Sequence, residues 1–213
     1  MQALQRVRDN LSEYLAGRLG YGALLAAMLL LGVVAGALAV SGLGSLERQE
    51  LMDVLGGYLR TLAGPGAAAP SAGLLFGRAL LSHGKSLALI WLLGVTVLGL
   101  PGVLALAFAR GFALGFAAAF LAAESGWRGI LFSLAAMLPQ NLLAWPALLM
   151  AGALALSFGV RFVQAHVQKA PFAFYTELGD YSLAMLLPAL GFLGAAALEA
   201  GLCPLLMAVA ARL

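Results

Sequence analysis

The sequence predicts an all-α integral membrane protein with about five transmembrane helices, and three observations carry this prediction. The chain has 213 residues, of which 63% are hydrophobic and only 10% are charged, whereas a soluble domain carries about 25% charged residues. Its mean hydropathy is +0.99. Residues 86–120 contain a single ionisable side chain, that of Arg110. About 20 apolar helical residues cross a bilayer, so this run is too long for one crossing and predicts two.

The first 19 residues are expected to form an amphipathic helix. Apolar side chains recur at helical spacing in this segment, while charged and polar ones fill the opposite face. Such a helix rests on a membrane surface, and we expect it on the cytoplasmic side. The alternative is a polar lead-in to the first span. The apolar face comprises Leu4, Val7, Leu11, Tyr14 and Leu15.

The first span is predicted over residues 20–40. Its apolar run ends without an Ala-x-Ala cleavage site, so we expect it to remain as a membrane anchor. It contains the pattern Gly32-x-x-x-Gly36, which lets a neighbouring helix approach closely. Packing against another helix is the expected role of these glycines, and a dimer face is the alternative.

The segment 41–85 is predicted to lie outside the membrane and to contain a second amphipathic helix. Ser45 is placed to cap this helix, and Gly64-Pro65 is placed to end it. The apolar face of the helix either docks a partner or rests on lipid. A further helix is expected to begin near Ser71 and to continue into the next span. The candidates for docking are Leu51, Leu55, Tyr58, Leu59 and Leu62.

The apolar run 86–123 is predicted to form the second and third spans, and two turn positions would divide it. A turn near Pro101-Gly102 would place Arg110 in mid-membrane, where an arginine costs about 2.5 kcal/mol or more. We therefore expect the turn at Arg110-Gly111, with Pro101 as a kink. Gly111 and Gly115 are further candidates for packing within the membrane.

The fourth span is predicted over residues 129–160, after a short loop at 124–128. Pro139 interrupts this span, and the adjacent Gln140 and Asn141 form the most polar point inside any span. The two amides can bond to backbone groups that the proline frees or to another helix. We favour hydrogen bonds between helices over a substrate site, because the spans contain few other polar groups.

Residues 161–181 are expected to form a loop with interfacial aromatic side chains, and the fifth span is predicted over residues 182–211. This last span contains Glu199, the one acidic residue within an apolar run. An acid inside a membrane is costly and often functional. Because a proton or ion relay needs a second ionisable group, we favour a carboxyl group that is neutral or hydrogen-bonded to a neighbouring helix or subunit.

The sequence lacks the groups that catalysis within a membrane needs. His83 and His166 are far apart, lie outside the predicted spans and belong to no His-Glu-x-x-His pattern. The single cysteine, Cys203, has no histidine near it and is expected to be a core residue. We therefore expect no enzymatic activity, no metal and no cofactor. The net charge of +3 indicates basic loops beside anionic lipid, so nucleic acid is not an expected partner.

Several short motifs follow one another along the chain and together carry a family resemblance. They are Trp91-Leu92-Leu93-Gly94, Gly99-Leu100-Pro101, Phe108-x-Arg110-Gly111-x-x-x-Gly115-Phe116, Gly126-Trp127, Ser133, Leu138-Pro139-Gln140-Asn141 and the late acid Glu199. In this order they resemble the stage II sporulation protein M (SpoIIM) family. The resemblance covers nearly the whole chain and is strongest between Trp91 and Asn141.

The resemblance implies a non-catalytic membrane scaffold that recruits and anchors peptidoglycan hydrolases at the septal membrane during forespore engulfment in sporulation. The implied partners are a SpoIID-like lytic transglycosylase and a SpoIIP-like amidase and endopeptidase, and a second copy of the chain is a further expected partner. Because the cell wall lies outside the membrane, we expect the N-terminus in the cytoplasm and the segment 41–85 outside. Lysines and arginines divide evenly between the two sides and do not decide the orientation.

A permease-like subunit that moves a small solute or a lipid is the alternative function. Several convergent polar groups inside the spans would favour it over a scaffold. The candidates for such groups are Gln140, Asn141, Glu199 and Arg110.

Overall fold

The computed structural model describes residues 2–63, 71–96, 99–169, 171 and 173–210, with side chains from Leu19 onward except those of 55, 58–63, 204 and 207–210. The predicted all-α membrane fold is confirmed: the structure is 94% helical, and the described residues contain no strand. The helices are α1 (Gln2–Ser41), α2 (Ser45–Ala63), α3 (Ala72–Val95), α4 (Gly99–Val167), α5 (Phe174–Ala184) and α6 (Leu186–Ala210).

Among the described residues, three helical segments are long and apolar enough to cross a membrane: Leu19–Ser41, Gly99–Val167 and Phe174–Cys203. The second has 69 residues but is not one straight rod, because Gly126 breaks α4 with φ of 58° and ψ of −137°. Glycine tolerates this positive φ because it has no Cβ. Residues 99–125 therefore run along the bundle in one direction, and residues 127–167 return in the other.

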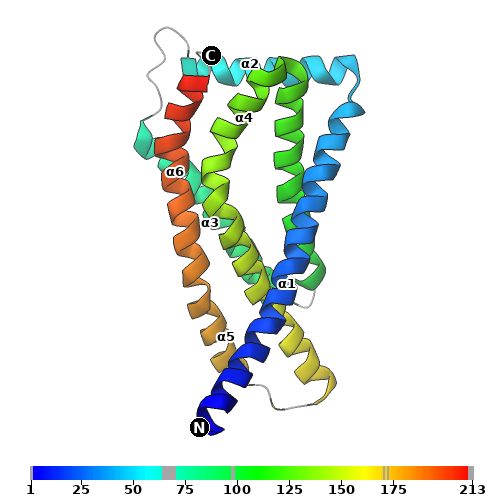
Figure 1. Cartoon of the computed structure of the whole chain (residues 1–213), viewed down its shortest axis with the longest axis vertical. Helices are drawn as coiled ribbons and strands as arrows, with labels where there is room; N and C mark the ends of the chain where they lie inside the picture. Colours follow the sequence, from blue (N-terminus) through cyan, green and yellow to red (C-terminus); the bar gives the residue numbers. More distant parts are fainter. Residues whose placement is uncertain (1, 64–70, 97–98, 170, 172, 211–213) are drawn as a thin grey trace.

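The long helices are packed side by side, with one helix lying across their end. α1, both halves of α4 and the α5–α6 pair follow the long axis of the molecule, while α3 crosses it obliquely (Figure 1). α2 lies across the end of the bundle to which α6 also leads, and the N-terminus lies at the opposite end (Figure 1). The first 19 residues continue into the first span within α1, and their placement on a membrane surface stays a prediction.

The backbones of α1 and α4 touch along a seam of four glycines. A Cβ added to Gly32 or Gly36 of α1 would overlap a backbone carbonyl oxygen of α4, that of Phe108 or Phe112. The relation is reciprocal, because a Cβ added to Gly111 or Gly115 of α4 would overlap a carbonyl oxygen of α1. Small residues spaced four apart allow such close approach of membrane helices. We call Gly32, Gly36, Gly111 and Gly115 the glycine seam.

The pattern Gly32-x-x-x-Gly36 packs against α4 of the same chain. All four seam glycines are buried within a single chain. The glycine face of α1 is therefore covered by α4 and is not open to a second copy. The expected close packing occurs, but the alternative of a dimer face on Gly32 and Gly36 is wrong.

The turn between the predicted second and third spans does not lie where we expect it from the sequence. α3 ends at Val95 and α4 begins at Gly99, so Arg110 sits inside a helix and the expected turn at Arg110-Gly111 is wrong. The structure provides this arginine with a partner, because its guanidinium donates a hydrogen bond to Ser86 Oγ of α3. Only glycine fits at position 99, because an added Cβ would overlap the Leu93 carbonyl oxygen.

The predicted loop over residues 161–181 is mostly helical. α4 continues to Val167, and α5 begins at Phe174. Tyr181, expected at the membrane interface, is only 4% exposed. Its ring stacks on Phe158 with centroids 4.9 Å apart, and its hydroxyl donates to the Trp91 carbonyl oxygen at 3.2 Å. These contacts lock α5 onto α3 and α4, so the tyrosine is a core residue.

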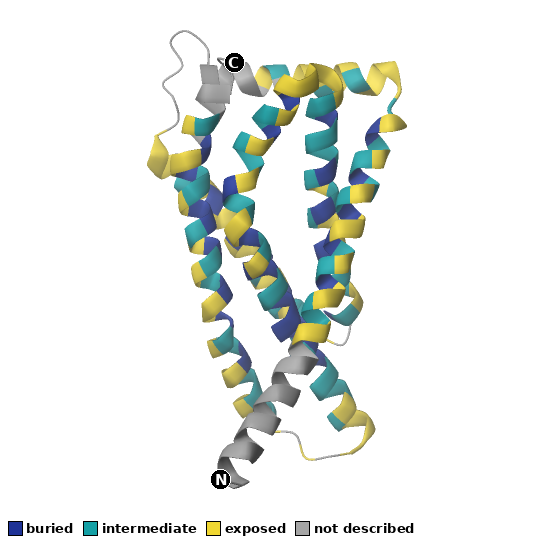
Figure 2. Ribbon diagram, viewed as in Figure 1, coloured by how far each residue is buried: buried dark blue, intermediate teal, exposed yellow. Residues whose placement is uncertain are grey.

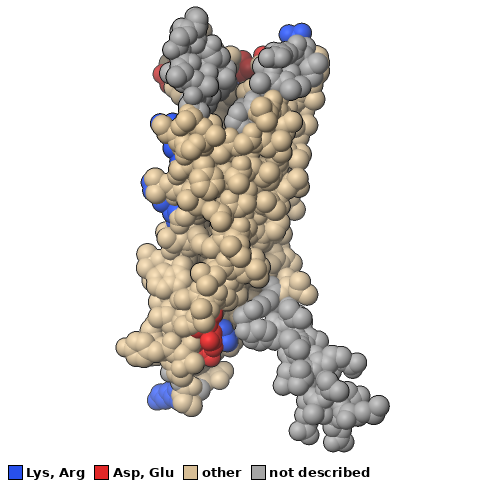
Figure 3. Space-filling view, turned by 90° about the vertical axis from the view of Figure 1, so that its left-hand side faces the viewer, with Lys and Arg blue, Asp and Glu red and all other residues tan. Residues whose placement is uncertain are grey.

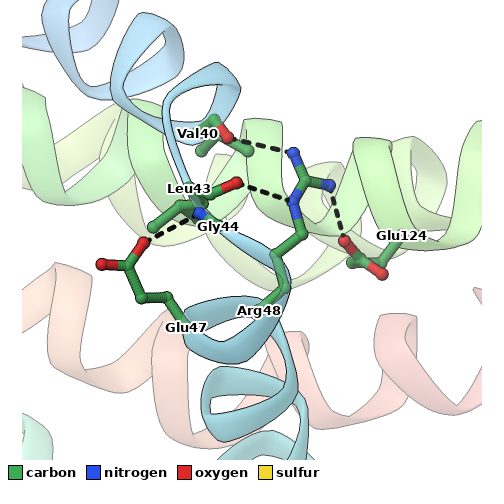
Figure 4. A network of polar contacts seen from close by, with 6 residues as sticks. All are labelled: Val40, Leu43, Gly44, Glu47, Arg48 and Glu124. Atoms are coloured by element: carbon green, nitrogen blue, oxygen red, sulfur yellow. Dashed lines mark hydrogen bonds and ion pairs between the residues drawn. The ribbon is translucent and has the colours of Figure 1, made fainter.

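A small polar network fixes α2 at the end of the bundle (Figure 4). Arg48 donates to the carbonyl oxygens of Val40 at 3.2 Å and Leu43 at 3.5 Å, which belong to the end of α1 and the following turn. Its third bond joins Glu124 Oε1 of α4 at 3.0 Å. α2 begins one residue earlier than the Ser45 cap predicts, because the Gly44 N–H donates to Glu47 Oε2 at 2.9 Å.

Buried positions lie mainly on the helix faces toward the interior of the bundle, and exposed positions lie mainly on the outer faces (Figure 2). Many of the exposed positions carry large apolar side chains. The core includes Leu25, Leu29, Ile90, Val103 and Phe158, each 2% exposed or less. Many leucines on the outer faces of α1, α4 and α6 are at least half exposed, including Leu31, Leu38, Leu142 and Leu190. An apolar surface of this extent suits contact with lipid rather than water.

The seam predicts that one added methyl group changes the stability of the protein in opposite directions at two glycines of α1. Gly36→Ala should destabilise the protein by about 1–3 kcal/mol, the usual cost of overpacking. Nothing lies within 4 Å of a Cβ added at Gly22, so Gly22→Ala should keep or raise stability, since alanine favours the helix. Thermal unfolding of both variants in detergent measures the difference. Equal melting temperatures would contradict the seam.

Candidate functional site

A polar cavity of about 240 Å³ lies between α3, α4 and α6. Both halves of α4 contribute to its wall, so the cavity exists only because α4 folds back at Gly126. The four polar candidates, which the sequence places at one predicted turn and in two predicted spans, meet here together with two residues of α3. The polar lining residues are Ser82, His83, Arg110, Gln140, Asn141 and Glu199.

His83 and Glu199 form the closest polar contact across the cavity. His83 Nε2 lies 3.3 Å from Glu199 Oε2, and the two form an ion pair when the imidazole is protonated. His83 is buried at 8% exposure, and its ring stacks on Phe192 of α6 with centroids 5.3 Å apart. Its Nε2 atom has no hydrogen bond of good geometry within the described residues. The contact joins α3 to α6 and supplies Glu199 with an ionisable neighbour.

His83 lies outside the predicted second span, which is expected to begin at Ser86. The predicted helix that starts near Ser71 and continues into this span is confirmed, because α3 begins at Ala72 with Ser71 as its N-cap and carries His83. The signal that could have found it is the spacing of Arg78, Ser82, Lys85 and Ser86, which share one side of a helix at steps of three and four residues. A polar stripe of this kind predicts a helix that faces a polar partner.

Gln140 and Asn141 bond to their own helix and not to a neighbouring one. Gln140 Nε2 donates to the Ala136 carbonyl oxygen at 3.3 Å, and Asn141 Nδ2 donates to that of Met137 at 2.7 Å. The favoured hydrogen bonds between helices are therefore not what the structure forms. Gln140 Oε1 is buried without a partner among the described residues. Both amides are half-buried and line the cavity beside Pro139, which is itself buried in α4.

The groups that line this cavity can bind a polar solute and exchange a proton. The cavity holds one imidazole, one carboxyl group, one guanidinium and two amides, a set that can hydrogen-bond a small polar solute. Within the described residues, no group of three or more histidine, cysteine, aspartate or glutamate side chains could hold a metal ion. Cys203 is buried at 2% exposure and does not line the cavity.

The docking candidates lie far from this cavity, on α2. Leu51 is half-buried, while Val54 beside it is 73% exposed. The side chains of Leu55, Tyr58, Leu59 and Leu62 lie outside the described residues.

Comparison with known protein families shows the family to which the chain belongs. The model of the family described as stage II sporulation protein M (SpoIIM) matches residues 25–204. The chain belongs to the stage II sporulation protein M family. The matched range includes the glycine seam, the turn at Gly126 and every residue that lines the cavity. No curated protein and no solved structure matches the chain.

Membership in the SpoIIM family confirms the resemblance carried by the motifs between Trp91 and Asn141. It indicates a sporulation-related membrane protein. The SpoIIM family is not known as a catalytic family.

The cavity predicts a pattern of thiol reactivity. Asn141→Cys should react with a small water-soluble thiol reagent in detergent, because the side chain lines a cavity large enough for water. The unmodified chain is the first control, since its only cysteine is 2% exposed and should stay unlabelled. Ala151→Cys, a fully buried position of the same helix, is the second. Mass spectrometry measures labelling, and an unreactive Asn141→Cys would contradict an accessible cavity.

Proposed function

We propose that the chain is a non-catalytic membrane scaffold that recruits and anchors peptidoglycan hydrolases at the septal membrane during forespore engulfment. Membership in the SpoIIM family supports this role. The observation that carries it is α2, an amphipathic helix that lies across one end of the bundle and is fixed there by Arg48 (Figure 4). The proposed partners are a SpoIID-like lytic transglycosylase and a SpoIIP-like amidase and endopeptidase.

The surface of α2 suits a docking role. Val54, next to Leu55 in the sequence, is 73% exposed, so apolar area remains open on a helix that lies at the end of the bundle. Amphipathic helices commonly insert their apolar face into a groove on a partner. The proposed docking face comprises Leu51, Leu55, Tyr58, Leu59 and Leu62.

The proposal requires a defined orientation in the cell membrane. α2 and the end of α6 should lie outside the cytoplasm, where the wall is, and the N-terminus should lie in the cytoplasm. A cysteine at Ser45, the first residue of α2, should therefore react with a membrane-impermeant reagent in intact cells, while one at Ser12 should not. Labelling at Ser12 alone would reverse the orientation.

The docking face is tested by introducing aspartate on either side of α2. Leu55→Asp with Leu59→Asp should release the hydrolases, because two buried leucines contribute about 3–6 kcal/mol. Leu46→Asp is the matched control, since Leu46 is an exposed leucine about half a helical turn away from Leu55 in angle. Co-purification of the hydrolases with each variant measures the effect. Equal recovery from the two variants and the unmodified chain would place docking outside α2.

The permease-like alternative is favoured by one specific observation, the meeting of His83, Arg110 and Glu199 with two amides in one cavity. A scaffold needs no such cavity, whereas a permease needs a polar site near the middle of its spans. Glu199→Gln separates the two functions. If it blocks sporulation while the hydrolases still co-purify in normal amount, the permease-like function is supported; if it leaves sporulation intact, the scaffold function is supported.

A further inference from the structure

A groove of about 390 Å³ lies between α3 and the first half of α4, next to the polar cavity. It shares Ser82 and Arg110 with the cavity, and its other lining residues belong to α3 except Leu106 of α4. Three residues that line the groove are cations, Arg78, Lys85 and Arg110, and none is acidic. The groove therefore concentrates positive charge between two helices.

The charge of this groove is not neutralised within the described part of the chain. The ion pairs found there are made by Arg48, His83 and Arg161. Arg78 and Lys85 are both exposed and lie seven residues apart, which is about two turns along the same face of α3. Figure 3 shows lysine and arginine atoms along the left-hand edge of the view, where the neighbouring surface between the two ends of the bundle is uncharged.

Arg110 is held in a fixed position at the base of the groove. Its guanidinium donates to Ser86 Oγ, and the Ser86 hydroxyl in turn donates to the Ser82 carbonyl oxygen at 2.9 Å. Ser86 is buried at 6% exposure, so this chain of bonds is protected from competing solvent. One bond to a neutral hydroxyl leaves the remaining N–H donors of the guanidinium available for an anion.

The remaining wall of the groove is apolar. Leu81 and Leu89 of α3 are 60% and 43% exposed, and Leu106 of α4 completes this side. The site thus combines cations with an apolar border on the outer surface of the bundle. A phospholipid has the same combination, with an anionic headgroup above acyl chains, and basic pockets between membrane helices bind such headgroups.

We propose that this groove binds a phosphate-bearing anion, held by Arg78, Lys85 and the positioned guanidinium of Arg110. The shared chemistry is that of an anionic phospholipid headgroup and of free phosphate. The site is separate from the proposed docking face on α2 and does not depend on recruitment of hydrolases.

The full chain, reconstituted in phosphatidylcholine nanodiscs with and without phosphatidylglycerol, tests the proposal. Native mass spectrometry should detect phosphatidylglycerol that stays bound to the protein. Added inorganic phosphate tests free phosphate as the ligand, by its competition with the lipid and by its effect on the melting temperature of the protein. Arg78→Gln with Lys85→Gln should weaken binding about 25-fold, from about five-fold for each cation. Arg128→Gln with Lys169→Gln removes the same charge from two exposed cations outside the groove and should leave binding unchanged.

Each outcome decides the proposal. Loss of anion binding in the groove variant alone supports the proposal. Retention of phosphatidylglycerol would then identify a lipid headgroup as the ligand, and stabilisation by phosphate alone would identify a free anion. Equal loss in both double variants would overturn it, because net charge alone would then explain binding. Absence of binding by either anion would also overturn it. Since Arg78 and Lys85 are exposed, both variants should fold, and an unchanged melting temperature without anion verifies this.

Discussion

Four glycines bring the backbones of α1 and α4 into direct contact, and the rest of the bundle is arranged around that contact. Lipid tails are as apolar as leucine, so burial of leucines does not drive membrane helices together. Close backbone approach and the dispersion contacts that it allows supply the attraction instead. By fixing the first half of α4 against α1, the seam also fixes where Arg110 lies relative to α3.

The polar side chains of the bundle are placed so that few face lipid alone. Arg110 meets Ser86, Glu199 meets His83, and the amides beside Pro139 bond back to their own helix. An ionisable group at the centre of a bilayer is costly without such partners. Gathering them around one cavity reduces this cost and creates the site that the permease-like alternative requires. The cationic groove beside it is the exception, because Arg78, Lys85 and Arg110 form no ion pair within the described residues.

Hydropathy and glycine patterns predict the helical segments, the turn near Gly126 and the close-packing glycines, because each depends on residues near one another in sequence. The turn before Gly99 is close to the alternative position near Pro101-Gly102, but the sequence does not favour it, because Ser86, the partner of Arg110, lies 24 residues away. The helix over Phe174–Ala184 falls mostly within the predicted loop for a similar reason. Arg161 and Glu177 pair at 2.9 Å and join α4 to α5. Pairings of this kind leave no periodic signal.

The attraction between α1 and α4 at the seam is tested most directly by dividing the chain between Gly64-Pro65, the predicted end of the second amphipathic helix, and the helix start near Ser71. Fragments 1–66 and 67–213, expressed together, should co-purify through the contact between α1 and α4. Gly32→Leu with Gly36→Leu should abolish recovery of the second fragment, whereas Gly20→Leu with Gly22→Leu should not, because nothing lies within 4 Å of a Cβ added at those two positions. Equal recovery of the fragment in both variants would contradict the account.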